Sequence, residues 1–288
     1  MKLVSFLHEE KDKIGCLIND HIVDLSIAAP SLPTDLLALL NLGPSALKQA
    51  EEAARIAESQ AYISPENITY LSLIQRPPKI ICIGRNYAAH AKEGGAEPPK
   101  YPEIFFRGAT SLLGHGSSII RPKCSSKLDY EGELVAIIGR TARHISRERA
   151  LEYIAGYSIF NDATLRDYQG KSSQWTIGKN FDNTGAFGPV FVSADELPNG
   201  AAGLRIQTRL NGKIMQDANT SDFIFPLEEL IEKLSECMTL EPGDIIVTGT
   251  PAGVGYVRRP PVYMKEGDIC EVEIEGIGVL SNPIVNES

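Results

Sequence analysis

No pair of cysteines is spaced as CxxC in this sequence, and no run of apolar residues is long. The five cysteines, at positions 16, 82, 124, 237 and 270, are odd in number and widely scattered. We therefore expect reduced thiols and a cytoplasmic protein rather than a disulfide framework. No apolar run reaches membrane-spanning length, and the early acidic residues Glu9 and Glu10 disfavour a signal peptide.

Basic residues are also fewer than acidic residues. The chain has 28 Lys and Arg residues against 37 Asp and Glu, which gives a formal net charge of −9 and a pI near 5.2. This balance argues against nucleic acid and anionic membranes as partners, because both repel an acidic protein. The Gly-rich segment 249–255 lacks the ending of a phosphate loop and the spacing of a dinucleotide site, which argues against nucleotide binding.

The chain is expected to divide into two domains at segment 75–79, where consecutive prolines remove backbone donors and disfavour a preceding helix. Residues 1–74 predict a small N-terminal α/β domain, and residues 75–288 a larger catalytic domain. In the first part, apolar periodicity predicts three strands and one helix. The strands are expected at Lys2–Leu7, Ile14–Ile18 and His21–Leu25, and the helix at Ser45–Tyr62.

The second part contains many strand-like runs and few helices. Helices are expected at Ala88–Glu93, at Arg147–Ala155 after the capping residue Ser146, and at Leu227–Ser235 after Pro226. This pattern predicts an α+β, mostly β fold, with a rolled or sandwiched mixed sheet. Strands are expected at Ile80–Gly84, Ser117–Arg121, Leu128–Ile138, Gly156–Phe160, Val190–Val192, Leu204–Leu210, Lys213–Gln216, Asp244–Thr248 and Cys270–Ile274.

Two glutamates in the predicted strand Leu128–Ile138 indicate a metal site. Glu131 and Glu133 are two residues apart, and alternate strand side chains share a face, so both carboxylates point to one side. Asp162, at the end of another apolar run, could supply a third carboxylate. Three converging carboxylates make an oxygen-only site that suits Mg²⁺, Mn²⁺ or Ca²⁺. The alternative is a solvated strand face whose charges are unrelated.

Arg166 and Gln169 follow Asp162 by four and seven residues, so the three side chains can share one face of a helix. The planar guanidinium of Arg166 would then lie beside the metal, where it could bind a substrate carboxylate through two hydrogen bonds. The alternative is an ordinary salt bridge at a helix start.

His90 and Glu93 are three residues apart on the predicted helix Ala88–Glu93, so their side chains would be neighbours. A carboxylate fixes the tautomer of a histidine and raises its basicity, which suits a general base that acts on water. Gly94 and Gly95 would let this segment move as a lid. The alternative is a surface helix with an incidental His–Glu pair.

Lys179 and Thr250 lie in two Gly-rich stretches. Lys179 could neutralise a developing enolate, and the hydroxyl of Thr250 could hold a carboxylate together with backbone N–H groups. The alternative for Lys179 is an ordinary exposed lysine.

Taken in order, these segments resemble the fumarylacetoacetate hydrolase superfamily, in its acylpyruvase and 2-hydroxyhepta-2,4-diene-1,7-dioate isomerase-like branch. The resemblance covers about Lys79–Pro283. It implies a mixed β-sandwich roll, a homodimer, and one divalent metal ion per subunit. The motifs that carry it are Gly84–Tyr87 with His90 and Glu93, Phe105–Arg107, Asp129–Leu134, Asn161–Gln169, Gly178–Asp182, Gly188–Pro189 and Thr248–Gly255.

The resemblance also implies roles for individual residues. Glu131, Glu133 and Asp162 would bind the metal, which would be Mg²⁺ or Mn²⁺, with Ca²⁺ as a further option. The catalytic groups would be His90 and Glu93, which activate water, and Lys179. Substrate contacts would come from Arg85, Tyr87, Arg107, Arg166, Gln169 and Thr250.

We predict a Mg²⁺- or Mn²⁺-dependent hydrolase that cleaves a carbon–carbon bond in a 2,4-dioxo acid such as an acylpyruvate. His90 would deprotonate water for attack on the distal carbonyl, and the metal and Lys179 would stabilise the enolate that remains. The same enolate arises in the oxaloacetate decarboxylases and hydroxymuconate-type isomerases of this superfamily, and the sequence does not separate them. The rival from another class is a catalytically silent dimer that binds metal and oxo acids.

Overall fold

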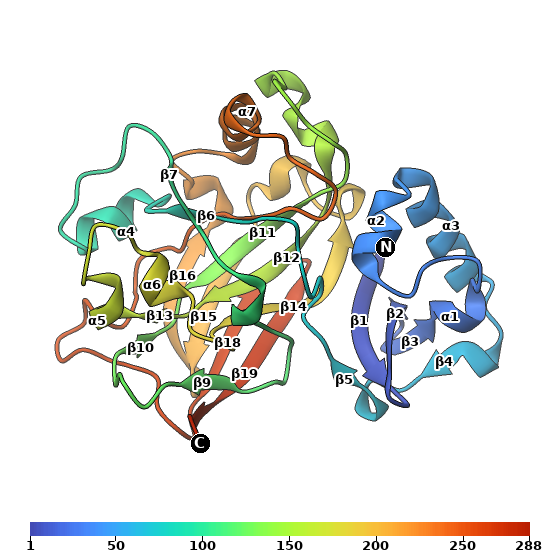
Figure 1. Cartoon of the computed structure of the whole chain (residues 1–288), viewed down its shortest axis with the longest axis horizontal. Helices are drawn as coiled ribbons and strands as arrows, with labels where there is room; N and C mark the ends of the chain where they lie inside the picture. Colours follow the sequence, from blue (N-terminus) through green and yellow to red (C-terminus); the bar gives the residue numbers. More distant parts are fainter.

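The computed structural model describes all 288 residues and shows a strand-rich molecule with two lobes (Figure 1). The first residues of the chain form a smaller lobe beside a larger body. The predicted α+β, mostly β architecture is confirmed. None of the helices has the length and apolar composition that a membrane crossing requires.

The two lobes together are built from two sheets and a short two-stranded ribbon. The ribbon pairs β10 (Leu128–Asp129) with β13 (Thr164–Leu165). The five-stranded sheet runs in the order β16 (Lys213–Asn219), β15 (Arg205–Leu210), β18 (Ile269–Ile274), β19 (Gly278–Asn286) and β9 (Ile119–Arg121). The twelve-stranded sheet runs in the order β4 (Tyr62–Ile63), β3 (His21–Asp24), β2 (Lys11–Ile18), β1 (Lys2–His8), β14 (Gly185–Ser193), β12 (Ile154–Asp162), β11 (Gly132–Ile138), β17 (Ile245–Val247), β6 (Ile80–Gly84) and β7 (Glu103–Phe106), with β5 (Thr69–Tyr70) on β1 and β8 (Leu112–Leu113) on β14.

Helices cover the edges and ends of these sheets. Short 3₁₀ turns connect the remaining elements, and the longest of them is η4 (Arg147–Tyr153). The α-helices are α1 (Leu25–Ala28), α2 (Leu36–Asn41), α3 (Pro44–Arg55), α4 (Ala88–Glu93), α5 (Arg166–Gln169), α6 (Thr176–Lys179) and α7 (Leu227–Cys237).

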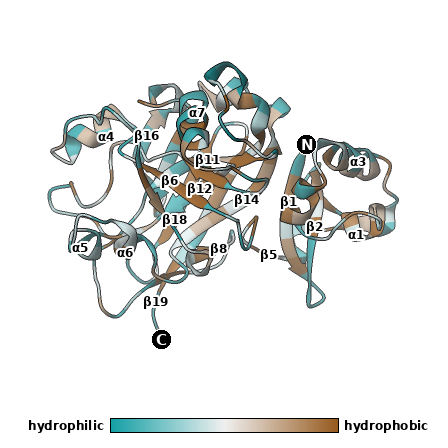
Figure 2. Cartoon of the chain, turned by 45° about the horizontal axis from the view of Figure 1, so that its top comes forward, coloured by the Kyte–Doolittle hydropathy of each residue, from teal (hydrophilic) through white to brown (hydrophobic).

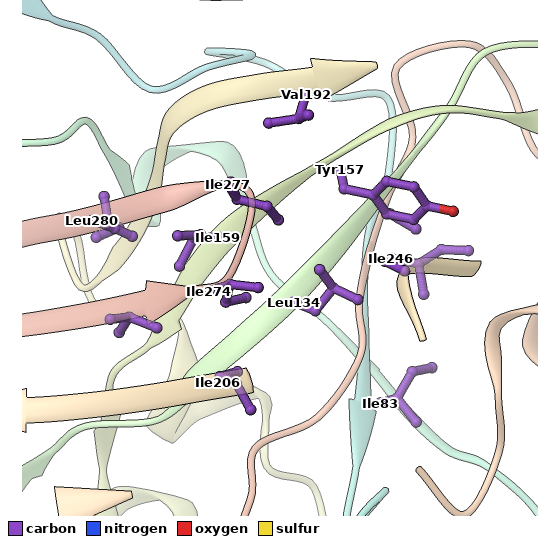
Figure 3. Packing of buried hydrophobic residues seen from close by; sticks show 14 of the residues in the cluster. Ile83, Leu134, Tyr157, Ile159, Val192, Ile206, Ile246, Ile274, Ile277 and Leu280 are labelled. Atoms are coloured by element: carbon purple, nitrogen blue, oxygen red, sulfur yellow. The ribbon is translucent and has the colours of Figure 1, made fainter. Parts of the chain in front are cut away.

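The central strands of the large sheet are apolar on both faces, which is why the two sheets stack. On β11, Leu134 points toward the five-stranded sheet, whereas its neighbour Val135 belongs to the core on the opposite face. Figure 3 shows Leu134 and Ile159 of the large sheet among Ile206 and Ile274 of the other sheet. Figure 2 shows the same strands as the most hydrophobic part of the body. Each such side chain stabilises the fold by about 1.5–3 kcal/mol when it is buried.

The N-terminal lobe is joined to the body through this sheet. Strand β1 pairs antiparallel with β14, with Lys2 opposite Val192 and Leu3 opposite Phe191. The core of the lobe is therefore continuous with one face of the large sheet, since Leu3 and Phe191 belong to the same buried cluster. The division into domains at residue 74 stays a prediction.

Three predicted elements differ from the structure. The strand expected at Leu128–Ile138 is interrupted at Tyr130 and Glu131, because β10 leaves the large sheet to pair with β13. The helix expected at Arg147–Ala155 is the 3₁₀ helix η4, since Ile154 already begins strand β12. The helix expected at Ser45–Tyr62 is α3, which ends at Arg55, because Tyr62 pairs with Val23 in the sheet.

Candidate active site

Three carboxylates meet because of the register between β11 and β12. Glu133 pairs with Phe160, and the backbone N–H of Asp162 donates to the carbonyl of Glu131 at 2.8 Å. Glu131 and Asp162 are thus cross-strand neighbours, and Glu133 follows Glu131 on the same face. Their carboxylate oxygens lie within 4.8 Å of one another, and none of the three residues is more than 4% exposed. The convergence of these side chains is therefore as predicted.

Cationic side chains surround two of these carboxylates. Lys179, the last residue of α6, places its Nζ 2.5 Å from Oε2 of Glu131 and 2.5 Å from Oδ2 of Asp162. Arg107 donates to Asp162, and Nη2 of Arg166 lies 2.6 Å from Oε1 of Glu131. Burial alone would lower the pKa of Lys179, but the two carboxylates outweigh it and the pKa is raised. Lys179 is thus a buried ammonium rather than an exposed lysine.

Glu133 has no cationic partner. Its carboxylate accepts one hydrogen bond, from the backbone N–H of Gly249 at 2.5 Å. Burial and the nearby Asp162 and Glu131 raise the pKa of Glu133 well above its usual range, whereas Arg166 and Lys179 overcome burial and lower the pKa of Glu131 to about 2. A buried carboxylate without a positive partner is costly. A divalent cation on the three carboxylates would supply that charge, so the donor set fits Mg²⁺ or Mn²⁺.

These carboxylates open onto a cavity of about 350 Å³. It lies near α4, α5 and α6, on the side of the body away from the N-terminal lobe (Figure 1). The cavity brings together most of the predicted site residues. Those that line it are Arg85, His90, Glu131, Glu133, Asp162, Arg166, Gln169, Lys179 and Thr250.

The segment 88–99, which we call the lid, forms one side of this cavity and carries the predicted His–Glu pair. Nδ1 of His90 lies 2.8 Å from Oε1 of Glu93, and the other oxygen of Glu93 accepts a hydrogen bond from the backbone N–H of Gly253 at 2.8 Å. Glu93 therefore orients the imidazole and leaves Nε2 for a ligand. This is the arrangement that general-base catalysis requires.

Arg166 is held on several sides. Its Nε donates to Asp129 at 2.8 Å, its Nη1 donates to Gln169 at 3.0 Å, and the ring of Tyr256 covers the guanidinium at 4.4 Å. Such fixation suits the recognition of a planar carboxylate. The prediction that Asp162 and Arg166 share one face of a helix is wrong, because Asp162 ends strand β12 whereas Arg166 begins α5.

Comparison with known proteins places the chain in a family. Residues 79–285 match the profile of the fumarylacetoacetate (FAA) hydrolase C-terminal domain. The chain belongs to the fumarylacetoacetate hydrolase family. It is 39% identical over 291 residues to a mitochondrial oxaloacetate tautomerase of Xenopus laevis, covering 99% of this chain and 90% of that protein.

Solved structures of the family align with this chain over its whole length. A fumarylacetoacetate hydrolase from Exiguobacterium antarcticum is 34% identical with a TM-score of 0.87, and each chain is covered completely. A maleylpyruvate hydrolase from Sphingobium sp. SYK-6, solved with manganese(II) and pyruvate, is 28% identical with a TM-score of 0.84, again with complete coverage of both chains. The predicted family and its β-sandwich fold are thereby confirmed.

Two residues to which the family resemblance assigns substrate contacts do not line the cavity. Tyr87 is buried, and its ring packs edge-on against Phe223 at 5.0 Å. Arg107 lies behind Asp162 and also donates to the hydroxyl of Thr184 at 2.8 Å. Tyr87 thus packs against Phe223 and Arg107 pairs with a buried carboxylate, and substrate contacts from these two residues stay predictions.

The sequence analysis missed two aromatic residues of this family site. Trp175 lines the cavity, stacks on the guanidinium of Arg85 at 5.5 Å and contacts Phe105 edge-on at 5.8 Å. Tyr256 also lines the cavity, and burial raises the pKa of its hydroxyl, which therefore remains a donor at neutral pH. A signal existed for Trp175, since it is the only tryptophan in the chain and follows a polar run.

Proposed function

We propose that this protein is a divalent-metal-dependent enzyme that interconverts the keto and enol forms of a small 2-oxo diacid such as oxaloacetate. The observation that carries this proposal is one cavity in which three buried carboxylates lie beside Lys179 and an oriented histidine. The tautomerase of Xenopus laevis, whose similarity extends over 99% of this chain, supports the choice of reaction.

The chemistry divides among the residues of the cavity. When bound by Glu131, Glu133 and Asp162, a metal ion would supply Lewis acidity toward the carboxylate and oxo oxygens of the substrate. We expect Arg166 and Gln169, which line the cavity, to bind the carboxylate next to the oxo group, and Arg85, which also lines the cavity and is ion-paired with Glu103, to bind the distal one.

Proton transfer falls to His90 and Lys179. Nε2 of His90 would take a proton from the carbon between the oxo group and the distal carboxylate, while Glu93 stabilises the imidazolium that forms. Lys179 would neutralise the charge that develops on the oxo oxygen, which then receives the proton from the imidazolium of His90, so that the enol is complete and His90 is neutral again. Atoms balance, because the substrate loses one C–H bond and gains one O–H bond.

The predicted carbon–carbon hydrolysis is the second candidate, and the His90–Glu93 pair favours it. The same Nε2 could deprotonate water for attack on the distal carbonyl of a 2,4-dioxo acid. Decarboxylation of oxaloacetate and a hydroxymuconate-type isomerisation share the enolate and remain alternatives. Homodimer formation and a cytoplasmic location also remain predictions.

An ultraviolet assay on metal-stripped protein distinguishes these reactions. Enol oxaloacetate and an acylpyruvate are offered with and without added Mg²⁺ or Mn²⁺, and the metal without protein is the control. A tautomerase removes the enol absorbance of oxaloacetate without forming pyruvate, and a decarboxylase forms pyruvate from it. A hydrolase forms pyruvate and a carboxylic acid from the acylpyruvate. If the protein changes none of these rates, the proposed tautomerase fails together with the decarboxylase and the hydrolase, and the hydroxymuconate-type isomerase and the silent metal-binding protein are left.

A further inference from the structure

Tyr256 touches both the carboxylate-binding arginine and the lid. Its ring covers the guanidinium of Arg166 at 4.4 Å, and its backbone N–H donates to Asp129, which also accepts from Nε of Arg166. At the other end of the side chain, the hydroxyl lies against Gly94, the residue that caps α4. One side chain therefore contacts both Arg166 and the lid segment.

The contact between Tyr256 and Gly94 leaves no room for a larger residue. A methyl group at Gly94 would lie 2.8 Å from the hydroxyl oxygen of Tyr256, which is closer than such atoms approach. The backbone at Gly94 has φ −78° and ψ 0°, a conformation that alanine adopts readily. A methyl group at this position would therefore have to displace the tyrosine hydroxyl, whereas the backbone itself permits alanine.

The segment that carries Tyr256 holds the other parts of the site as well. The backbone N–H of Gly249 donates to Glu133, that of Gly253 donates to Glu93, and that of Gly255 donates to Asp129 at 2.8 Å. The lid thus rests on this segment at two successive residues, Glu93 and Gly94. The lid therefore contacts the same segment that holds Asp129 and Tyr256 against Arg166.

We propose that Tyr256 is a positioning residue that couples closure of the lid to the binding of a substrate carboxylate by Arg166. Its hydroxyl is the surface on which Gly94 packs when the lid is closed, and its ring fixes the plane of the guanidinium. The identity of the acid rests on the proposed function, but the contact between Tyr256 and the lid does not.

A double-mutant cycle on Gly94 and Tyr256 tests this coupling. Gly94→Ala should push the lid away from Tyr256, and Tyr256→Phe should make room for the added methyl. The first readout needs no ligand: tryptic cleavage at the exposed Lys92 and Lys100 should speed up in Gly94→Ala and return to the original rate in the double variant. Gly95→Ala is the matched control: its added methyl meets open space, so any faster cleavage comes from backbone strain at φ +77° and Tyr256→Phe should not rescue it.

The second readout is oxalate binding at saturating Mg²⁺, followed by the fluorescence of Trp175, which lines the cavity. Gly94→Ala should weaken oxalate binding about tenfold, and the double variant should recover it. An unchanged cleavage rate in Gly94→Ala, or no rescue by Tyr256→Phe, would overturn the proposal. If the unmutated protein does not bind oxalate, the proposed function fails, whereas the cleavage cycle still decides whether the lid packs on Tyr256.

Discussion

The two sides of the cavity are built in different ways. The carboxylates lie at the ends of two paired strands inside a twelve-stranded sheet, where hydrogen bonds and apolar packing fix their register. The lid is one six-residue helix followed by an exposed turn, and it rests on the body through Glu93 and Gly94. A short helix with few buried contacts opens at a lower free energy than a central strand.

This difference would assign ligand binding and proton transfer to different sides of the cavity. Metal and substrate oxygens would be held by the rigid side, which needs no movement to form. His90, the proposed general base, lies on the lid, so proton transfer would begin only when the lid has excluded water and brought His90 into place. Substitutions on the two sides should therefore have distinct effects on metal affinity and on turnover.

The largest effect is expected on the rigid side, from Asp162→Asn. The change removes one carboxylate of the metal site and the partner of the buried Arg107, so Mn²⁺ affinity should fall by more than about 100-fold. The free energy of unfolding of the metal-free protein should fall by about 3–5 kcal/mol. Calorimetric titration and urea unfolding measure the two quantities. Asp167→Asn, outside the cavity, is the control and should retain the affinity; retained affinity in Asp162→Asn would remove this residue from the metal site.

On the lid side, His90→Ala should lower turnover about 10²–10⁴-fold and leave Mn²⁺ affinity unchanged, because we propose the imidazole as the general base and not as a metal ligand. Initial rates of loss of the enol absorbance measure the first quantity. Glu93→Gln keeps the size of the orienting side chain and should cost less. A normal rate in His90→Ala would show that the reaction does not depend on the lid.

Arg85→Gln tests the part of the cavity between the two sides. The guanidinium lies on Trp175 and would bind the distal carboxylate, and a charged hydrogen bond contributes about 1.5–3 kcal/mol. KM for oxaloacetate should therefore rise about 10- to 100-fold, with a smaller change for an acylpyruvate that lacks this carboxylate. Arg140→Gln, on an exposed residue outside the cavity, is the control. Equal effects on both substrates would contradict the assignment to the distal carboxylate.

The smallest effect should come from Gly95→Ala. Gly95 has φ +77°, a conformation that costs alanine about 1–2 kcal/mol, so the lid should open more often. Hydrogen exchange within residues 88–99 should become up to about tenfold faster, while Mn²⁺ affinity stays unchanged. Gly116→Ala introduces the same backbone strain elsewhere, since Gly116 has φ +75°, and should leave exchange in the lid unaltered. Altered metal affinity in Gly95→Ala would mean that the two sides are not independent.

The carboxylate site was largely predictable because its signal is local. Alternation along a strand places Glu131 and Glu133 on one face, and this survives the break that separates β10 from β11. The break itself could not be predicted, since it arises from pairing with β13, which lies far along the chain. Likewise, the position of Arg166 could not be predicted, because β12 ends at Asp162 and the short strand β13 lies between Asp162 and Arg166.

The roles of Tyr256 and Trp175 could not be predicted for the same reason. Each is defined by a contact with a residue distant in sequence, Arg166 in one case and Arg85 in the other. Periodicity reports which face of an element is apolar, but it does not report which elements meet. The contacts of Arg107 with Asp162 and Thr184 were likewise not predictable, because a motif position does not reveal which side of a carboxylate another side chain approaches.

The pairing of β1 with β14 limits how this protein can be recombined with its relatives. The family match begins at residue 79, which suggests a natural unit for exchange. A chain cut there would leave the edge of β14 open at Val192 and expose the apolar face that Leu3 covers. Unprotected strand edges template association between copies. A functional chimera must therefore bring a compatible first strand with it, and the unit to exchange is larger than the segment that matches the family profile.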